Sequence, residues 1–583
     1  MSRRRTGGVG DGPGPVAGRA LVAGAIGEPA AGPDRFVPDW LLEVARTAPD
    51  RLAVVDDAGA RWTFAELADT AERLAVGLDR SGLRAGDRVA ALLADGAPFV
   101  ALVHAVRRLG AVLVPLNRRA TAAELGPQLA EVGARLLVSD DTTAALARAA
   151  AAAAGTTMPD RAPGTATPGG GTGMATPDRA PGTATPDRAP GTDRRPGPGP
   201  LVVPVDELER LGSRPGEPAA ARLRALVDLA AAATIVFTSG TTGRPKGAVL
   251  RHANHRASAA AWAAFLGPRP ADRWLACLPL YHVGGLAILD RAARWGVPVL
   301  VQRRFDPAAV ARALVEDEVS HLSLVPTMLR AVLETHEGRP VPETLRAVLL
   351  GGGPTPAPLV LEATGRGWPV VPTYGLTETA SGVTALPTGE AALRPGSAGR
   401  PLAGVEIAIR VADRDARPGR VGAIGEIGEI LVRGPVVFAG YDGRPVETAA
   451  VLVDGWLRTG DLGSIDEAGH LAVVDRRDDL LVSGGENVYP AEVEAVLRAH
   501  PGIEDAAVVG RPDARWGSVP VAAVVARPGA SIDPVELAGF CRARLAGYKV
   551  PVAFRLVGAL PRSAGGKLLR REVRTMLGEG RDD

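Results

Sequence analysis

The chain has little lysine, and this scarcity is its most informative feature. Lys246, Lys549 and Lys567 are the only lysines among 67 basic residues, and the others are arginine. Such a background retains lysine where a compact, flexible ammonium is needed and a planar guanidinium does not serve. Chance survival is the alternative. Lys246 and Lys567 both lie in glycine-rich strings, 238–247 and 561–567, of the kind that hold phosphate.

Cysteine, long apolar runs and net charge are also low, and each absence excludes a class of protein. Two isolated cysteines, Cys277 and Cys541, argue against a disulfide framework or a metal cluster and favour a reducing compartment. No apolar run approaches the ~20 residues of a membrane helix. A net charge of +2 offers no nucleic-acid-binding surface. The arginines at 3–5 are not followed by the apolar core of an export signal. The sequence predicts a cytoplasmic protein with no nucleic-acid partner and no membrane span.

Helical and strand patterns alternate from about Arg35 to Asp140 and again from Thr234 to Thr384, which favours parallel sheets covered on both faces. Thr63 and Glu66 form a capping box that predicts the start of a helix. Strands and turns dominate from 399 to 475. We predict an α/β fold with a large N-terminal domain over 35–475, built of two α/β sheet subdomains and a small β-rich subdomain. A hinge over 476–479 and a small α+β C-terminal domain over 480–577 complete the prediction.

Two segments have compositions that cannot bury enough apolar surface to fold. Residues 1–34 are rich in glycine, proline and alanine. The sequence Pro-Asp-Arg-Ala-Pro-Gly-Thr occurs at 159–165, 177–183 and 186–192, within a Pro/Gly-rich stretch from 155 to 200. We predict a disordered N-terminal extension and a disordered insertion.

The segment from 234 to 249 begins as a buried strand and ends in small and hydroxyl residues. Glycines let backbone N–H groups approach an anion, hydroxyls donate hydrogen bonds and Lys246 adds charge. The loop is not a Walker A motif, because Lys246 stands between Pro245 and Gly247. The predicted phosphate-binding residues are Thr238, Ser239, Gly240, Thr241, Thr242, Gly243 and Lys246.

The string from Thr238 to Gly247 resembles the phosphate-loop signature of the adenylate-forming superfamily, which includes acyl-CoA synthetases, luciferases and adenylation domains. Further motifs occur in the order typical of that family, and the resemblance runs from about Arg35 to Leu577 apart from the insertion. It implies that ATP and a carboxylic acid form an acyl-adenylate. ATP, Mg²⁺ and CoA are the implied cofactor and cosubstrates.

The string Thr373–Glu378 resembles the family's adenine and magnesium motif. By that resemblance Tyr374 stacks on adenine, Thr377 contacts the α-phosphate, and Glu378 holds Mg²⁺ together with Thr238. Other residues that the resemblance assigns to ATP or AMP are Gly352, Gly353, Pro354, Thr373 and Gly375.

The string Arg458–Asp461 resembles the ribose-binding motif, in which Asp461 accepts from the hydroxyls. Arg476 matches a further ribose contact, Asp478 the hinge position and Lys567 the C-terminal catalytic lysine. Attack on the α-phosphorus crowds negative charge at one centre, which a mobile ammonium and a metal ion relieve. The implied catalytic residues are Lys567, Lys246, Glu378 and His282.

Candidates for the thiol step lie in the C-terminal region. The string Leu480–Pro490 resembles the loop that lines the pantetheine tunnel, where Gly484 and Gly485 allow a thin arm to pass close to the backbone. Trp516 resembles a residue that contacts the CoA nucleotide, and ordinary packing is an equal alternative. Lys549 either contacts a CoA phosphate or pairs across the domain interface.

Four strings, 281–288, 349–356, 374–381 and 396–402, surround the implied acyl pocket. They resemble the o-succinylbenzoate–CoA ligases of menaquinone biosynthesis more than the fatty-acid enzymes. His282 either gates the site or bonds the substrate, and a core histidine is the alternative. The unactivated carboxylate of o-succinylbenzoate needs a partner, for which we consider His282, Ser381, Thr384 or an arginine that the sequence does not place. The predicted acyl-substrate residues are His282, Gly285, Leu286, Gly352, Ser381 and Thr384.

Taken together, the motifs predict a ligase that converts 2-succinylbenzoate, ATP and CoA to 2-succinylbenzoyl-CoA, AMP and pyrophosphate. A medium-chain fatty or aryl acid–CoA ligase is the alternative, followed by an enzyme that loads a carrier protein. A non-catalytic nucleotide-binding protein would have lost Lys567 or Glu378, and both are present. The substrates are small molecules, and a homodimer is compatible with the prediction.

Overall fold

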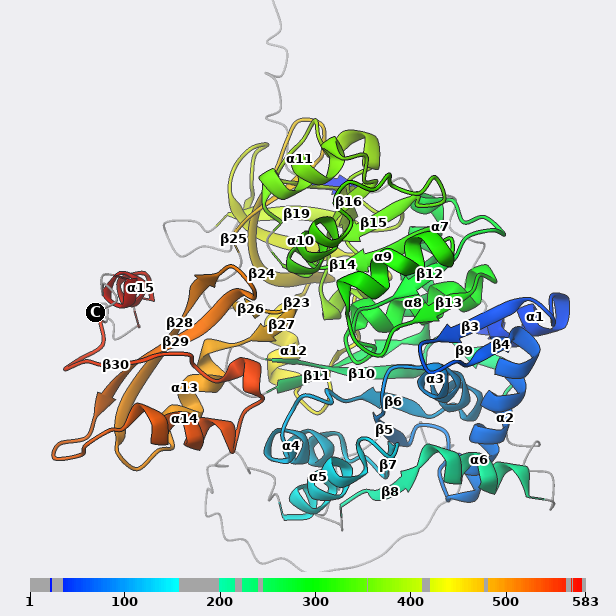
Figure 1. Ribbon diagram of the computed structural model, residues 1–583, viewed down its shortest axis with the longest axis horizontal. Coiled ribbons are helices and arrows are strands. Elements are labelled where there is room, and N and C mark those ends of the chain that lie inside the picture. The colour runs from blue at the N-terminus through cyan, green and yellow to red at the C-terminus, as the bar shows by residue number, and fades with distance from the viewer. Residues whose placement is uncertain are drawn as a thin grey trace, which may run out of the picture.

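The computed structural model describes residues 21–23, 35–156, 199–214, 223–239, 245–353, 355–411, 420–475, 481–561, 568 and 570–578. Within these ranges the chain forms a large body and a smaller lobe that contains the C-terminal elements (Figure 1). The predicted hinge over 476–479 lies outside the described residues, as do most of the segments 1–34 and 155–200. The predicted α/β fold class is confirmed.

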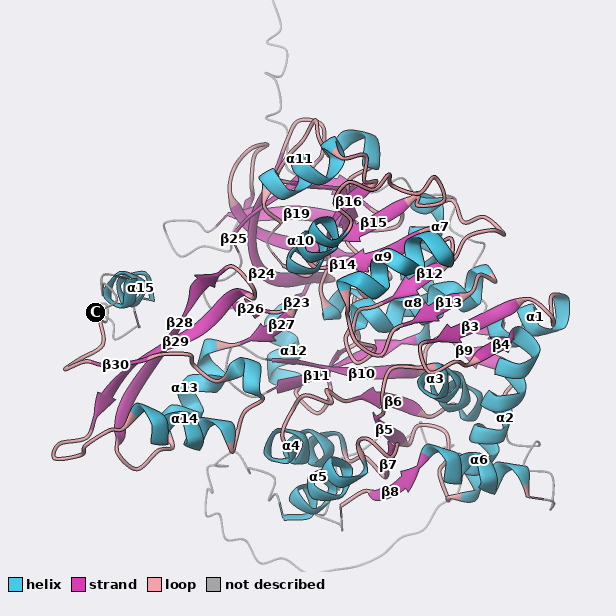
Figure 2. Ribbon diagram, in the orientation of Figure 1, coloured by secondary structure: helices cyan, strands magenta, loops and turns pink. Residues whose placement is uncertain are grey.

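One sheet of the large body has seven strands, with the helices of the first α/β region packed around it (Figure 2). Its inner strands are parallel and β10–β11 is an antiparallel hairpin. In spatial order the strands are β22 (Gly440–Tyr441), β11 (Pro245–Arg251), β10 (Ala232–Ser239), β6 (Val112–Pro115), β5 (Arg88–Leu92), β7 (Leu136–Ser139) and β8 (Leu201–Pro204). The helices are α2 (Phe64–Arg80), α3 (Ala97–Leu109), α4 (Ala122–Val132), α5 (Ala144–Thr156) and α6 (Val205–Ser213).

The predicted capping box opens α2. The Thr63 hydroxyl accepts from the Glu66 amide at 3.2 Å, and the Glu66 carboxylate accepts from the Thr63 amide at 2.8 Å. Two amides that would otherwise lack partners at the helix start are thereby satisfied. The same arrangement recurs at α4, where Thr121 and Glu124 cap each other.

A second, sixteen-stranded sheet joins the other α/β region to the β-rich region without a break in pairing. Strands β3 to β16 on this path are parallel apart from β4, and those from β17 onward are antiparallel. Along its path run β1 (Leu21–Ala23), β19 (Glu406–Val411), β21 (Gly428–Arg433), β24 (Trp456–Ile465), β25 (Leu471–Asp475), β18 (Ser397–Pro401), β17 (Thr384–Ala385), β16 (Val370–Tyr374), β15 (Ala347–Leu350), β14 (His321–Leu324), β12 (Trp274–Ala276), β13 (Val299–Val301), β3 (Leu52–Asp56) and β4 (Arg61–Thr63), with β20 (Arg420–Val421) and β23 (Leu452–Val453) paired at its side.

The sequence did not predict β1, which falls inside the 1–34 extension and pairs antiparallel with β19. A further two-stranded pair is formed by β2 (Phe36–Pro38) and β9 (Leu226–Asp228). The remaining helices of the large body are α1 (Trp40–Thr47), α7 (His252–Leu266), α8 (Val283–Trp295), α9 (Pro307–Glu316), α10 (Pro326–Thr335), α11 (Ala357–Gly365) and α12 (Pro445–Val451).

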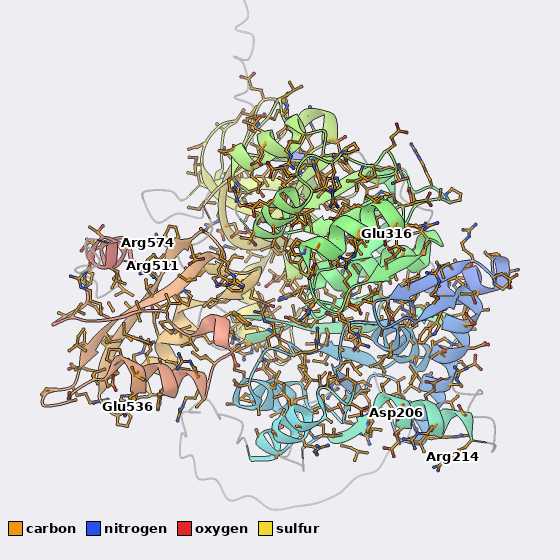
Figure 3. The ribbon with its side chains drawn as sticks, viewed as in Figure 1. Asp206, Arg214, Glu316, Arg511, Glu536 and Arg574 are labelled. Atoms are coloured by element: carbon orange, nitrogen blue, oxygen red, sulfur yellow. The ribbon has the colours of Figure 1, made fainter. Side chains whose placement is uncertain are left out.

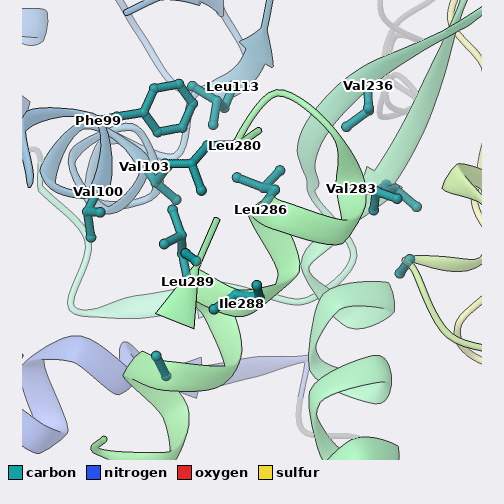
Figure 4. Close-up of a cluster of buried hydrophobic side chains, with 14 of the residues drawn as sticks. Phe99, Val100, Val103, Leu113, Val236, Leu280, Val283, Leu286, Ile288 and Leu289 are labelled. Atoms are coloured by element: carbon teal, nitrogen blue, oxygen red, sulfur yellow. The ribbon is translucent and has the colours of Figure 1, made fainter. Parts of the chain in front are cut away.

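The two layers of the large body meet where α8 packs against α3 (Figure 4). Phe99 and Val103 from α3 face Leu286 and Leu289 from α8, and all four are buried. Each such side chain contributes roughly 1.5–3 kcal/mol by leaving water. This contact fixes α8, whose first turn begins at His282.

The small lobe is a five-stranded sheet with helices on both faces. Successive residues of β28 alternate between two cores, so that Ala506 packs beneath α13 and α14 while Ala507 packs beneath α15. The strands are β26 (Leu481–Ser483), β27 (Glu486–Val488), β28 (Ile503–Asp513), β29 (Gly517–Ala526) and β30 (Phe554–Leu556), and the helices are α13 (Pro490–Arg498), α14 (Pro534–Arg542) and α15 (Arg570–Gly578).

Charged side chains such as Glu316, Arg511 and Arg574 lie at the periphery of the molecule (Figure 3). Among the described helices, none has both the length and the apolarity needed to cross a membrane.

Candidate active site

A cavity of about 1480 Å³ is lined by residues from both the large body and the small lobe. It brings together residues that the sequence analysis selected from motifs far apart in the chain. Those in its wall are Thr238, Lys246, His282, Gly352, Thr373, Gly375, Thr377, Glu378, Ser381, Asp461, Gly484, Gly485, Trp516 and Lys549.

Several predicted residues cannot be placed in the cavity, because they lie outside the described residues. These are Gly240, Thr241, Thr242, Gly243, Pro354, Arg476, Asp478 and Lys567. Of Ser239 only the backbone is described, as the last residue of β10. Their proposed roles stay predictions.

Three residues predicted for the acyl pocket do not line the cavity. Leu286 is buried in the α3–α8 contact. A Cβ on Gly285 would lie 2.4 Å from the Pro279 carbonyl oxygen, so this glycine serves close backbone packing. Thr384 is fully buried and its hydroxyl donates to the Ala398 carbonyl oxygen at 2.7 Å. Gly353 is likewise absent from the wall.

The β10–β11 hairpin positions the phosphate-binding candidates. Thr238 and Lys246 are paired opposite each other on the two antiparallel strands, so they lie side by side near the end of the hairpin. The Lys246 ammonium lies 5.2 Å from the centre of the Tyr441 ring. An ammonium and a hydroxyl at the mouth of a glycine-containing loop suit a phosphate chain.

Glu378 lies in a 3-10 helix over Thr377–Thr379, directly after the end of β16. Its carboxylate accepts a hydrogen bond from the Tyr441 hydroxyl at 2.8 Å. Burial and the neighbouring Glu378 charge raise the pKa of Tyr441, so Tyr441 stays protonated and donates. This bond fixes the direction in which the carboxylate faces the cavity.

The oxygen donors at this end of the cavity fit Mg²⁺. A carboxylate from Glu378 and a hydroxyl from Thr238 are hard ligands of the type that Mg²⁺ prefers. No group of three or more acidic, histidine or cysteine side chains that could hold a metal occurs in the described part of the chain. A Mg²⁺ ion bound here would neutralise phosphate charge, and phosphate and water oxygens are further ligands that Mg²⁺ commonly takes.

Asp461 lies on β24 and accepts from the Tyr374 hydroxyl at 2.8 Å. The Asp461 amide donates to the Thr459 hydroxyl at 3.1 Å, which holds the turn of the Arg458–Asp461 motif. Tyr374 is buried beneath the wall, and its stacking on adenine stays a prediction.

Arg291 is a cavity residue that the sequence analysis did not select. It lies on α8, is only 3% exposed, and donates to the Ser381 hydroxyl at 2.6 Å. The guanidinium lies between the rings of Trp262 and Trp274, at 4.9 and 5.7 Å. Desolvation lowers the pKa of Arg291 to about 9, which still leaves it charged near neutral pH.

The acid next to Arg291 forms its ion pair with another arginine. Asp290 pairs with Arg107 at 2.7 Å, and its charge also acts on Arg291, where it raises the pKa against the effect of burial. The Arg291 Nε has no hydrogen-bond partner in the described structure. The backbone of Ser381 is left-handed, with φ of +81°, a strained conformation that turns its hydroxyl toward Arg291. The cavity thus contains a buried cation able to receive an anion.

The carboxylate of Glu486, in the small lobe, is hydrogen-bonded by residues of the large body. It accepts from the Tyr281 hydroxyl at 2.5 Å, from His282 Nε2 at 2.9 Å and from Arg119 at 3.2 Å. Burial would raise the pKa of Glu486, but the bonds from His282 and Tyr281 and the charge of Arg119 hold it at about 2. His282 is therefore bonded across the domain interface.

Lys549 also pairs across the interface. Its ammonium contacts Glu124 of α4 at 2.7 Å and Glu492 of α13 at 2.8 Å. Burial opposes its charge, but Glu492 and Glu124 raise the pKa of Lys549 above its ordinary value. The interface alternative is thus the contact seen, and a contact with CoA phosphate stays a prediction.

Trp516 packs against the glycines of the small lobe. A Cβ on Gly484 would lie 2.7 Å from the Trp516 ring, and the backbone there has φ of +57°. The Trp516 ring is 40% exposed and lines the cavity, with Arg515 at 4.7 Å from its centre. The contact with Trp516 and the positive φ therefore require glycine at 484, and the passage of a pantetheine arm there stays a prediction.

The two site residues missed by sequence reasoning carried weak signals. Glu486 is the only acid in the string Leu480–Pro490, which could have identified it. Arg291 is one of many arginines, and only its place on the buried face of α8 distinguishes it.

Comparison with known proteins decides the family. The family model for the AMP-binding enzyme matches residues 41–442, and that for the AMP-binding enzyme C-terminal domain matches 492–567. The chain belongs to the AMP-binding enzyme family. The predicted family is therefore confirmed.

Curated and solved relatives cover nearly the whole chain. A 2-succinylbenzoate–CoA ligase of Geobacillus kaustophilus is 39% identical over 93% of this chain and 98% of its own. The Bacillus subtilis ligase is 36% identical over 92% of this chain and 97% of its own. A structure of o-succinylbenzoate CoA synthetase from Bacillus subtilis with the acyl-adenylate OSB-AMP has a TM-score of 0.65 at 36% identity, covering 94% of this chain and 99% of that one.

A second structure of the Bacillus subtilis enzyme is more similar. A double mutant of that enzyme bound to the product analogue OSB-NCoA has a TM-score of 0.79 at 35% identity, covering 93% of this chain and 98% of that one. Both structures cover nearly the whole of this chain and share its fold.

Proposed function

We propose that this AMP-binding enzyme converts 2-succinylbenzoate, ATP and CoA to 2-succinylbenzoyl-CoA, AMP and pyrophosphate, a step of menaquinone biosynthesis. The protein is an ATP-dependent, AMP-forming acid–thiol ligase, as its motifs predict and its relatives bear out. ATP, Mg²⁺ and CoA are its cofactor and cosubstrates; a Bacillus subtilis relative has been solved with ATP and magnesium ion.

The reaction has two steps that share the cavity. A carboxylate oxygen attacks the α-phosphorus of ATP, the bond to the bridging oxygen breaks and pyrophosphate leaves. The CoA sulfur then attacks the acyl carbon, and AMP leaves with the carboxylate oxygen. Lys246 and Glu378 serve the first step by holding charge at the phosphate end of the cavity. We assign Lys567 to the same step.

The single observation that carries the substrate assignment is the buried cation Arg291. 2-Succinylbenzoate keeps a second carboxylate on its ring after the succinyl carboxylate is activated, and this group would be costly to bury without a partner. Arg291 is itself buried in the cavity wall and has a neighbouring hydroxyl on Ser381, and the adjacent acid, Asp290, forms its ion pair with Arg107. A dicarboxylic aromatic acid satisfies this site, whereas a fatty acid would leave the cation unpaired.

The test combines a substrate analogue that lacks the ring carboxylate with a variant that lacks the Arg291 guanidinium. Pyrophosphate release is measured with 2-succinylbenzoate and with 4-oxo-4-phenylbutanoate, which lacks only the ring carboxylate. Wild-type enzyme should favour 2-succinylbenzoate about 100-fold or more in kcat/KM, as an unpaired buried charge costs ~3 kcal/mol or more. Arg291→Met should remove most of this preference. Arg294→Met is the matched control, because Arg294 lies one turn on along α8, packed over Trp40.

Equal use of both acids by the wild type, or turnover of octanoate or benzoate with 2-succinylbenzoate inert, would overturn the substrate assignment. An Arg291→Met variant that keeps the full preference would show that another group holds the carboxylate. The predicted homodimer and the cytoplasmic location stay predictions, which sedimentation and cell fractionation can test.

A further inference from the structure

A buried cluster of three charges joins the small lobe to the large body. Lys549, in a 3-10 helix over Gly547–Lys549, contacts Glu124 in the first turn of α4 and Glu492 in the first turn of α13. All three side chains are less than one tenth exposed. Glu124 belongs to the large body and the other two to the small lobe. Charge-assisted bonds in so dry a setting are strong and little screened by salt.

Each partner of the interdomain pair also has a partner in its own domain. The second oxygen of Glu124 accepts from the Thr121 amide at 2.7 Å and from the Thr121 hydroxyl at 2.9 Å. Lys549 donates a hydrogen bond to Glu492 within its own lobe, and this bond does not depend on the large body. A buried charge left alone is strongly destabilising. Neither charge would therefore be left alone if this contact opened.

The cluster lies in a strip of contacts that leads to the cavity. Asn117 donates to the Tyr548 hydroxyl at 3.0 Å, and the Arg119 guanidinium lies 4.9 Å from the Tyr548 ring centre. Arg119 also reaches Glu486, the carboxylate bonded to His282. Segment 117–124 of the large body therefore faces the small lobe beside the thiol end of the cavity.

We infer that Glu124 and Lys549 are positioning residues for the thiol step. Their ion pair holds the small lobe where Gly484, Gly485 and Glu486 line the cavity, and neither residue acts on the reacting atoms. The inference rests on the proposed ligase function only in taking thioester formation as the step that this arrangement serves.

The test separates the two half-reactions. Glu124→Gln keeps the size and the cap acceptor but removes the charge that faces Lys549. With supplied acyl-adenylate and CoA, thioester formation should slow about tenfold in kcat, the effect of ~1.4 kcal/mol, at unchanged KM for CoA. Adenylation, followed as ATP–pyrophosphate exchange, should be unaffected. Lys549→Met should slow the same half-reaction, and by more, because it also leaves the buried Glu492 without this partner. The double variant should lose little more than Lys549→Met.

Glu66→Gln is the matched control, since it alters the same type of capping box on α2 away from the lobe interface. It should change neither half-reaction. If Glu124→Gln slows both half-reactions equally, or if Lys549→Met raises KM for CoA while Glu124→Gln has no effect, the inference is wrong. The second result would assign Lys549 to CoA phosphate.

A measurement on the ligand-free protein tests the positioning role independently of the proposed ligase function. Hydrogen–deuterium exchange of 481–488 in the ligand-free protein should be faster in Glu124→Gln than in wild type and in Glu66→Gln. Equal exchange in all three would overturn the positioning role. If the wild type does not use 2-succinylbenzoate, the substrate assignment is wrong, but the exchange result for 481–488 still tests the positioning role.

Discussion

The end of the cavity that we assign to the nucleotide (the nucleotide end) and the end that we assign to the CoA thiol (the thiol end) are built in different ways. At the nucleotide end, Thr238, Lys246, Glu378 and Asp461 all come from the large body. At the thiol end, Glu486 and Lys549 of the small lobe meet partners of the large body that are hundreds of residues away in sequence. The first end is fixed by strand ends and hairpins of one folded unit, whereas the second exists only while two units are in contact.

This difference predicts which substitutions affect adenylation and which affect thioester formation. A change at the nucleotide end should affect adenylation whatever the position of the small lobe. A change in the interdomain contacts should affect thioester formation alone, because it alters the population of one arrangement and not the chemistry of the other.

The largest effect is expected at Lys567. Lys567→Ala should slow adenylation by about 100- to 1000-fold, as loss of a group that stabilises transition-state charge does. Thioester formation from supplied acyl-adenylate should persist. Lys567→Arg should also fail in adenylation, because a guanidinium does not replace a compact ammonium. Equal loss of both half-reactions in a stopped-flow assay would remove the division between the two ends.

Glu486 should show the opposite pattern. Glu486→Gln replaces a carboxylate that accepts from Tyr281, His282 and Arg119, and an amide cannot accept from all three. Thioester formation should fall about tenfold or more, with pyrophosphate exchange retained. Glu504→Gln removes an exposed carboxylate of the same lobe and serves as control. Loss of exchange in Glu486→Gln would contradict the assignment of this residue to the thiol end.

Tyr441→Phe should sharpen the description of the nucleotide end. Without its hydroxyl, Glu378 loses the donor that fixes its carboxylate, and a hydrogen bond to a charged group contributes about 1.5–3 kcal/mol. The concentration of Mg²⁺ that half-saturates pyrophosphate exchange should rise severalfold. KM for CoA should stay constant, and an unchanged Mg²⁺ dependence would mean that Tyr441 does not position Glu378.

The smallest effect concerns stability at Asp95, a buried carboxylate beside Arg118 in the cavity wall. Burial raises the pKa of Asp95 to about 6, against the charge of Arg118. The folded state therefore binds this proton more tightly than the unfolded state, so ionised Asp95 destabilises the fold above about pH 6 and the penalty shrinks as pH falls through that value.

Asp95→Asn should accordingly raise the thermal unfolding midpoint at pH 8, by the equivalent of about 1–3 kcal/mol. The gain should shrink at pH 5. Asp50→Asn, at an exposed turn, should give no such pH-dependent gain. A gain that is equal at both pH values would mean that ionisation of Asp95 is not its source.

The sequence predicted cavity residues at both ends, but at the thiol end it did not predict the interdomain partners, for a physical reason. Thr238 and Lys246 are close in sequence and pair across one hairpin, so a local motif contains their geometry. The capping box at Thr63 is local in the same way. The partner of Lys549 is set by how two lobes meet, and two acids of ordinary appearance, Glu124 and Glu492, carry no mark of it in the sequence.

The acyl pocket shows a second limit. Gly285 and Leu286 were selected from a string of the right character, but a helix turns its side chains in different directions. Leu286 faces the α3 core, and Arg291, further along α8, faces the cavity. The residue types of the string indicated that it lies near the acyl pocket. Which of its side chains face the cavity depends on how α8 packs against its neighbours, and the string does not show this.

The most direct test of the two-ended cavity is a single-turnover measurement of both half-reactions in Lys567→Ala and Glu124→Gln, side by side with wild type. Lys567→Ala should slow adenylation about 100- to 1000-fold and keep thioester formation, and Glu124→Gln should keep adenylation and slow thioester formation about tenfold. Loss of the same half-reaction in both variants would contradict the division of the cavity between one rigid domain and one interdomain contact.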